Sequence, residues 1–264
     1  MATHLFDEVG PTGAVQLRLG LGALILLVLA RPWRTRPSLA AAGAAVLYGV
    51  TLAGMNTAFY EALDRLPLGV AVTVEFLGPL SVALAGSRRL LDVSWALMAA
   101  GGVGLLASRG DGTVSLAGLG FAALAGAFWA AYILASQRVG RLLPGTSGLA
   151  LALPVAAALV APLAIPAAGA DLLHPEVLAI GLAVALLSSV LPYSLELSAL
   201  RRLPARVFGV LMSLEPAAAA VAGFVVLGQS LTRTQVVALG LVSAASIGVT
   251  ASSPRARDTP PVRD

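Results

Sequence analysis

The sequence contains no cysteine, only two histidines and few charged residues, and each shortage excludes a class of protein. Without cysteine the chain forms no disulfide, has no thiolate nucleophile and cannot hold a Cys-ligated zinc. The histidines, His4 and His174, fall in expected loops, which argues against a metal site and a histidine-based triad. No enzyme motif or phosphate-binding loop of an ATP-driven pump is found. We therefore predict a protein that is not an enzyme and that uses no cofactor.

Charge is the second shortage, and it sets the class of protein. Only 11% of the residues are charged while 58% are hydrophobic, whereas a soluble domain has about a quarter charged residues. The composition therefore predicts an integral membrane protein whose partner is the lipid bilayer. The net charge of +4 does not indicate nucleic-acid binding, because every basic residue is arginine and the arginines follow membrane topology.

Apolar runs bounded by charge or proline predict nine membrane spans. Each has roughly the ~20 residues that cross the hydrocarbon core, and a spanning backbone must satisfy its own hydrogen bonds, so all are expected to be helices. The predicted spans are 12–30, 38–63, 67–86, 92–108, 114–136, 147–168, 175–199, 204–227 and 233–251. In the span 114–136, small residues recur every four positions and predict close helix packing, at Gly118, Ala122, Gly126 and Ala130.

The arginines orient these spans. Thirteen of the seventeen fall on one side of the predicted membrane, and three fall on the other side among acidic residues. The positive-inside rule makes the arginine-rich side cytoplasmic, which places the C-terminus inside the cell. The seventeenth, Arg18, lies near the start of the first span, and we expect its side chain to reach outward to water.

An internal repeat relates two proline-bracketed segments, 66–79 and 203–216. Each opens with Leu-Pro and carries a second proline twelve residues later, so Pro67 and Pro79 correspond to Pro204 and Pro216 with a shift of 137. The arginine topology starts the first segment outside and the second inside. The halves are therefore predicted to be inverted repeats, an arrangement in which secondary transporters bind substrate at the midplane.

The same shift shows that the two halves differ in length. It carries 147–168 onto 10–31 and 175–199 onto 38–62, but it carries 114–136 to a position before residue 1. The second half is therefore predicted to have five spans and the first half four, so we expect the first helix of the repeat unit to be missing. Either the true start lies upstream of Met1, which we favour, or this is a nine-helix variant with its N-terminus outside.

Four carboxylates lie in or near the spans, and their depths differ. At 1.5 Å per residue, Glu75 lies about 12 Å past its leading proline and Glu215 about 16 Å past its own, so both are expected near the midplane. Glu196 lies near the cytoplasmic end of its span and Glu61 near the outer end. A charge at the centre of a span costs about 2.5–3.5 kcal/mol on insertion scales. Glu75 is therefore predicted to face a substrate or proton path, the alternative being a protonated structural glutamate.

Prolines break the hydrogen-bond ladder beside these carboxylates. Pro79, Pro192 and Pro216 have no N–H, so each frees the carbonyl four residues earlier and is expected to kink its helix. The freed carbonyls belong to Glu75, Ser188 and Met212. Such kinks are tolerated where a polar cavity or another helix satisfies them. Glu215 is a second candidate for the path, although it and Pro216 could serve only to shape the kink.

Polar and aromatic residues on other spans complete the candidate site. Asn56 and Tyr60 share one helix face, being four residues apart, while Trp129 and Tyr132 are three apart, as are Tyr193 and Glu196. Aromatic residues at these positions also serve as interfacial anchors or packing elements, so both interpretations stay open for them. Asn56 lies well inside its span and is harder to explain by packing alone.

Several of these motifs resemble the EamA branch of the drug/metabolite transporter superfamily, and most of all its inner-membrane threonine/homoserine exporters. The resemblance covers residues 10–252 and rests on Gly54-Met55-Asn56, 67–80, Ser87-Arg88-Arg89, Phe128-Trp129 through Leu134, Leu191-Pro192-Tyr193 through Glu196, and Met212 through Pro216. It implies ten helices in two inverted five-helix repeats, a central cavity and efflux of small amphiphilic metabolites. The chain departs from it in lacking the first helix, in agreement with the repeat.

These observations predict an all-α polytopic membrane protein with a first repeat over 1–109, a second over 110–252 and a disordered cytoplasmic tail over 253–264. The predicted function is alternating-access export of amino acids such as threonine or homoserine, driven by the proton-motive force. The alternatives are a drug or other metabolite exporter of the same fold, and a non-transporting, truncated membrane protein. The expected partners are a small-molecule substrate and lipid, and a homodimer is compatible with them.

Overall fold

The structure is a computed structural model that describes residues 5–85, 90–108, 115–195, 212 and 214–252. The described residues form helices and contain no strand, which confirms the predicted all-α class. In chain order the α-helices are α1 (Phe6–Ala30), α2 (Leu39–Leu63), α3 (Leu68–Glu75), α4 (Leu77–Ala85), α5 (Leu90–Ser108), α6 (Leu116–Leu142), α7 (Ser147–Ala168), α8 (Pro175–Ala185), α11 (Glu215–Leu227) and α12 (Arg233–Ser252). Two short 3₁₀ turns, η2 (Pro32–Thr35) and η3 (Gly169–Leu173), and a π-helical turn, η4 (Leu186–Val190), lie between them.

Many of these helices can cross a bilayer. Within the described ranges, five helical stretches are long and apolar enough to span a membrane: 6–30, 39–63, 116–142, 147–173 and 175–195. Shorter apolar helices cover 68–82, 93–105, 215–227 and 233–249. Each lies within or overlaps a predicted span, so the prediction of a multi-pass membrane protein is confirmed.

Three predicted spans have a different internal structure from a single straight helix. The span 67–86 consists of α3 and α4, which meet at Phe76. The span 175–199 contains the π-helical turn η4 just before Pro192. In the span 204–227, α11 begins only at Glu215, and residues 204–211 lie outside the described part of the chain. In each case the interruption lies beside one of the prolines expected to kink the helix, because proline cannot continue the ladder of N–H donors.

The first helix begins earlier than predicted. The sequence predicts a span from residue 12, but α1 extends back to Phe6 across a kink at Gly10, where φ is 68° and ψ is 173°. This backbone region is open almost only to glycine, and Pro11 follows directly, so the two residues allow the helix to resume in a new direction. The earlier start moves the centre of α1 toward Arg18.

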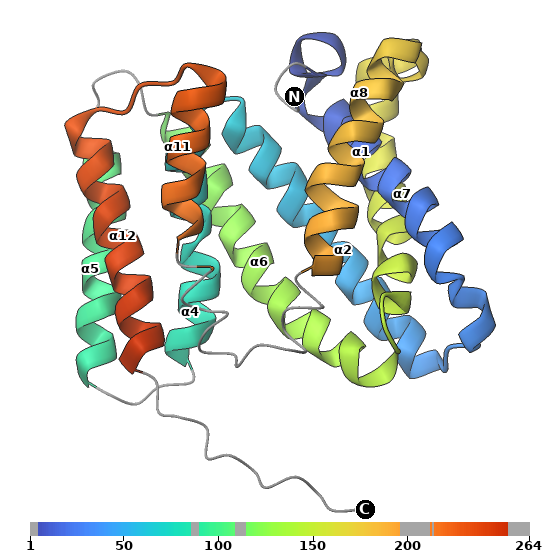
Figure 1. Cartoon of the computed structure of the whole chain (residues 1–264), viewed down its shortest axis with the longest axis horizontal. Helices are drawn as coiled ribbons and strands as arrows, with labels where there is room; N and C mark the ends of the chain where they lie inside the picture. Colours follow the sequence, from blue (N-terminus) through green and yellow to red (C-terminus); the bar gives the residue numbers. More distant parts are fainter. Residues whose placement is uncertain (1–4, 86–89, 109–114, 196–211, 213, 253–264) are drawn as a thin grey trace, which may run out of the picture.

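Helices of the two halves intermix in the packed structure. Figure 1 shows α5 beside α12 at one end and α1, α7 and α8 at the other, with α2 and α6 slanting between them. Under the shift of 137 residues, α1 corresponds to α7 and α5 to α12, and each of these pairs is in direct contact. The largest buried apolar cluster joins α1, α2, α6, α7 and the region of α8, and smaller clusters lie around α3 and α5.

The small-residue stripe of α6 permits close helix contacts near the site. Gly118 faces Leu66, Ala122 is fully buried, and Gly126 faces the backbone of Glu75. A Cβ atom added at Gly126 would lie 2.6 Å from the carbonyl oxygen of Glu75, where only glycine leaves enough room. The predicted role of the stripe in close helix packing is confirmed.

Candidate functional site

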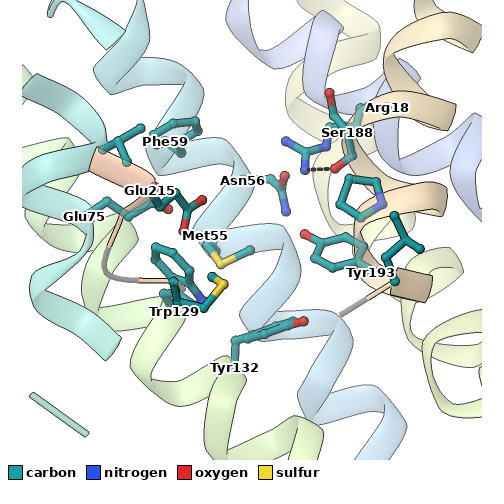
Figure 2. A pocket seen from close by; sticks show the side chains of 14 residues that line it. Arg18, Met55, Asn56, Phe59, Glu75, Trp129, Tyr132, Ser188, Tyr193 and Glu215 are labelled. Atoms are coloured by element: carbon teal, nitrogen blue, oxygen red, sulfur yellow. Dashed lines mark hydrogen bonds between the residues drawn. The ribbon is translucent and has the colours of Figure 1, made fainter. Parts of the chain in front are cut away.

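A central pocket lies among the helices of the two halves of the chain. Its volume is about 470 Å³, and residues from α1, α2, α3, α6, the α8–η4 segment and α11 line it. Figure 2 shows most of these side chains pointing toward one shared space. The lining residues are Arg18, Met55, Asn56, Phe59, Val72, Glu75, Trp129, Tyr132, Ser188, Pro192, Tyr193, Leu195, Met212 and Glu215. The polar members of this set come from both halves of the chain.

Two carboxylates form the acidic wall of the pocket. Glu75 is the last residue of α3 and Glu215 the first residue of α11, so each lies at a helix break. Figure 2 shows the two side chains close together on the same side of the pocket. The proline after each glutamate has a distinct structural effect. Pro79 cannot donate to the Glu75 carbonyl, whereas Pro216 occupies the first turn of α11, where no intrahelical N–H bond is needed.

The opposite wall carries a cation that the sequence analysis placed elsewhere. Arg18 does not reach outward to water as expected; it lines the pocket. Its Nε donates to Ser189 Oγ at 2.8 Å, and its Nη2 donates to the Ser188 carbonyl at 2.6 Å. The expectation was wrong because α1 begins at Phe6, which puts Arg18 at the middle of this 25-residue helix rather than near its start. From that position the side chain points into the pocket instead of toward the end of the helix.

The acceptors of Arg18 lie on the π-helical turn η4. Pro192 has no N–H to bond to the Ser188 carbonyl, and the guanidinium of Arg18 takes that place. Ser189 is fully buried, and its hydroxyl accepts the second bond. The carbonyl that the sequence predicts to be free is therefore satisfied by the arginine that the sequence analysis left out of the site.

Tyr60 supports Arg18 rather than lining the pocket. The guanidinium carbon lies 5.7 Å from the centre of the Tyr60 ring, a distance typical of a cation–π contact. Phe6 also packs against this tyrosine, with the ring centres 5.6 Å apart. Tyr60 is thus buried next to the cation and is one layer removed from the space that a ligand would occupy.

Aromatic rings form much of the remaining wall. The ring of Tyr132 lies between Tyr48 at 5.2 Å and Tyr193 at 6.0 Å, measured between ring centres. Trp129 contacts Phe76 edge-on, with the ring centres 5.7 Å apart. Tyr132, Tyr193 and Trp129 all face the pocket (Figure 2). Such rings supply flat apolar surface, and tyrosine and tryptophan add a hydrogen-bonding edge.

Asn56 is the polar residue of α2 at the pocket. Its side chain is 2% exposed, and Nδ2 donates to the Leu52 carbonyl one turn earlier at 2.8 Å. This bond fixes the amide, whose carbonyl oxygen can accept from a ligand. Asn56 therefore lies where the sequence analysis placed it, well inside its span and among the other candidate residues.

Most of the predicted site residues come together in this pocket. The structure places seven at its lining: Asn56, Glu75, Trp129, Tyr132, Pro192, Tyr193 and Glu215. Glu61 lies apart and pairs with Arg65 at 2.7 Å, and Glu196 lies outside the described residues. Sequence reasoning missed Met55, Phe59, Val72, Ser188, Leu195, Met212 and, above all, Arg18. Among the residues that the structure describes, no group of histidine and acidic side chains could hold a metal ion.

The chain is a multi-pass helical protein with charged side chains at a central pocket, and comparisons with known proteins give its family. Residues 116–251 match the EamA-like transporter family. The chain is 47% identical over 252 residues to the threonine/homoserine exporter RhtA of Escherichia coli K12, and 46% identical to that of Salmonella typhimurium LT2. Both alignments cover 95% of this chain and 85% of the relative.

The chain therefore belongs to the EamA-like transporter family. It is a transporter and not an enzyme. A solved crystal structure of a protein is also similar, with 25% identity and a TM-score of 0.59 over 96% of this chain and 92% of its own.

Proposed function

We propose that the protein exports small amino acids, with threonine and homoserine as substrates, through the central pocket. The relatives of this family that are nearly half identical are named for these two compounds. The observation that carries the proposal is the acidic wall, because Glu75 and Glu215 both line the central pocket. Carboxylates within membrane-spanning segments are costly and mark substrate or proton paths.

The pocket has the size and the chemistry for such substrates. Small-molecule sites have volumes of about 300–1,000 Å³ and join apolar walls to a few placed polar groups. The pocket, at about 470 Å³, combines aromatic rings with Asn56 and the two glutamates. An amino acid with a short polar side chain fits this combination, since its ammonium needs an acceptor and its hydroxyl needs a hydrogen-bonding partner.

Glu75 is the group that couples transport to its energy source in this proposal. It binds the substrate ammonium in one state and a proton in the other, so the proton-motive force drives efflux against a gradient. Its carbonyl, which Pro79 leaves without a helical donor, packs on Gly126 of α6, so a movement of α6 would shift the backbone that carries the carboxylate. Asn56, Tyr132, Trp129 and Tyr193 line the path, and Tyr60 supports it from behind.

Alternating access would come from two inverted repeats, over 1–109 and 110–252. A two-fold axis in the membrane plane brings equivalent helices together, and the contacts of α1 with α7 and of α5 with α12 support such an axis. The arginine distribution supports a cytoplasmic C-terminus. Association of two copies of the chain into a homodimer also stays a prediction.

Transport by the purified protein in liposomes tests the proposal. Liposomes loaded with unlabelled threonine should accumulate labelled threonine by counterflow, and an imposed proton gradient should drive net movement. Glu75→Gln should remove the response to the gradient. Glu61→Gln is the matched control, because Glu61 pairs with Arg65 away from the pocket. Export by Glu75→Gln with an unchanged response to pH would contradict the assignment of Glu75.

A further inference from the structure

Arg18 has a position that the proposed coupling by Glu75 does not use. It lies at the middle of α1 and lines the pocket, yet among the described residues no carboxylate lies within ion-pair distance of its guanidinium. A charge buried at such depth is costly unless a counter-charge or a set of hydrogen bonds stabilises it. The two bonds to Ser188 and Ser189 go to neutral groups, so neither of them supplies a counter-charge in contact with this cation.

The surroundings of Arg18 hold the guanidinium in one orientation. Ser189 Oγ fixes Nε, the Ser188 carbonyl fixes Nη2, and the Tyr60 ring lies near one face of the group. These bonds use two of the five N–H groups of an arginine, and the remaining ones can bind a planar anion. Guanidinium is the side chain best matched to a carboxylate, which it binds through paired N–H bonds. The π-helical turn that presents these acceptors is a feature often found at functional sites.

The charges of the pocket are therefore separated across it. Figure 2 shows Arg18 and Ser188 on one side and Glu75 with Glu215 on the other, with Asn56 between them. An α-amino acid carries the complementary pair of charges, an ammonium and a carboxylate on the same carbon. This match of opposite poles is what gives a charged site its selectivity, because a ligand lacking one pole leaves a buried charge without a partner.

We propose that Arg18 binds the carboxylate of the substrate, so that the pocket selects dipolar α-amino acids and rejects amines, esters and lactones of the same size. This inference rests on the proposed function, since it names the class of substrate that the same pocket takes. Ser188, Ser189 and Tyr60 are positioning residues that hold the guanidinium for this contact, and Glu75 with Glu215 receives the ammonium.

Ligands that differ only at the carboxyl group test this proposal. Competition against labelled threonine is measured in proteoliposomes with unlabelled threonine, its methyl ester and its reduced alcohol, threoninol. For the unaltered protein, threonine should compete at least about tenfold better than the other two, which is the usual effect of losing a charged hydrogen bond. Ligand-induced thermal stabilisation of the purified protein gives the same ranking without transport.

Variants then assign the discrimination to Arg18. Arg18→Gln should weaken threonine binding by about tenfold or more, while threoninol binding stays the same. Ser189→Ala keeps the cation but removes one of the hydrogen bonds that orient it. This variant should therefore weaken the binding of threonine by a smaller factor and leave the binding of threoninol unchanged. Arg138→Gln, an exposed arginine of α6, is the matched control and should behave as the unaltered protein.

The possible results separate this inference from the proposed function. If Arg18→Gln and Ser189→Ala weaken the binding of threonine and of threoninol equally, Arg18 has only a structural role and the inference is wrong. The proposed export still holds in that case. If threonine and its ester compete equally with the unaltered protein, carboxylate recognition is excluded. If the unaltered protein neither binds nor moves any amino acid, the proposed function fails and this inference fails with it.

Discussion

The contact of α6 with Glu75 permits a sharp test, because it depends on a single missing atom. In Gly126→Ala the new Cβ would lie 2.6 Å from the Glu75 carbonyl oxygen, a backbone atom that cannot turn aside. Gly120→Ala on the same helix is the matched control, since a Cβ there meets nothing within 4 Å. Both changes gain about 0.5–1 kcal/mol of helix propensity, so the difference between the variants isolates the steric clash.

The magnitude follows from the effect of overpacking. Forcing extra atoms into a filled interior costs about 1–3 kcal/mol. With about 2–4 °C lost per kcal/mol in a chain of this size, Gly126→Ala should melt about 2–12 °C below Gly120→Ala. Unfolding can be followed by the fluorescence of the three tryptophans, one of which, Trp129, lies one turn from Gly126. Equal melting temperatures for the two variants would show that α6 does not pack against α3 at this glycine.

Two further predictions concern the aromatic wall and the topology. Tyr132 packs against the rings of Tyr48 and Tyr193, so Tyr132→Phe should keep the melting temperature nearly unchanged. Tyr132→Ala removes the ring and should lower the free energy of unfolding by about 3–5 kcal/mol. Equal losses of stability for the two variants in a thermal melt would instead assign the effect to the hydroxyl. The chain has no cysteine, so single cysteines replacing Arg65 and Arg202 can be labelled without background, and an impermeant maleimide should reach them from opposite faces of the membrane. Labelling of both positions from the same face would contradict the inverted repeat.

Much of the fold is predictable because the bilayer fixes the length of a spanning helix. The predicted bounds of α2 and α7 agree with the structure to within a residue, since charge and proline delimit these runs. The breaks beside Glu75 and Glu215 are also predictable, because a proline cannot donate a backbone hydrogen bond. These are properties of neighbouring residues, and the sequence states them directly.

The role of Arg18 was not predictable in the same way. Its depth depends on where α1 begins, and the kink at Gly10 hides several residues of helix before the apolar run. Its partners, Ser188 and Ser189, are 170 and 171 residues away in the chain, and no local pattern pairs them with an arginine. The one available signal was the carbonyl that Pro192 frees, which requires a donor from another helix.

Protection of a pocket residue by substrate tests the central claim most directly. Met55 lines the pocket, and Met55→Cys places the only thiol of the chain there, so its alkylation by a membrane-permeant maleimide can be timed with and without threonine. Arg34→Cys, in the exposed turn after α1, is the control. We expect saturating threonine to slow alkylation at position 55 several-fold and to leave position 34 unchanged. The same rate at position 55 with and without threonine would contradict amino-acid binding in this pocket.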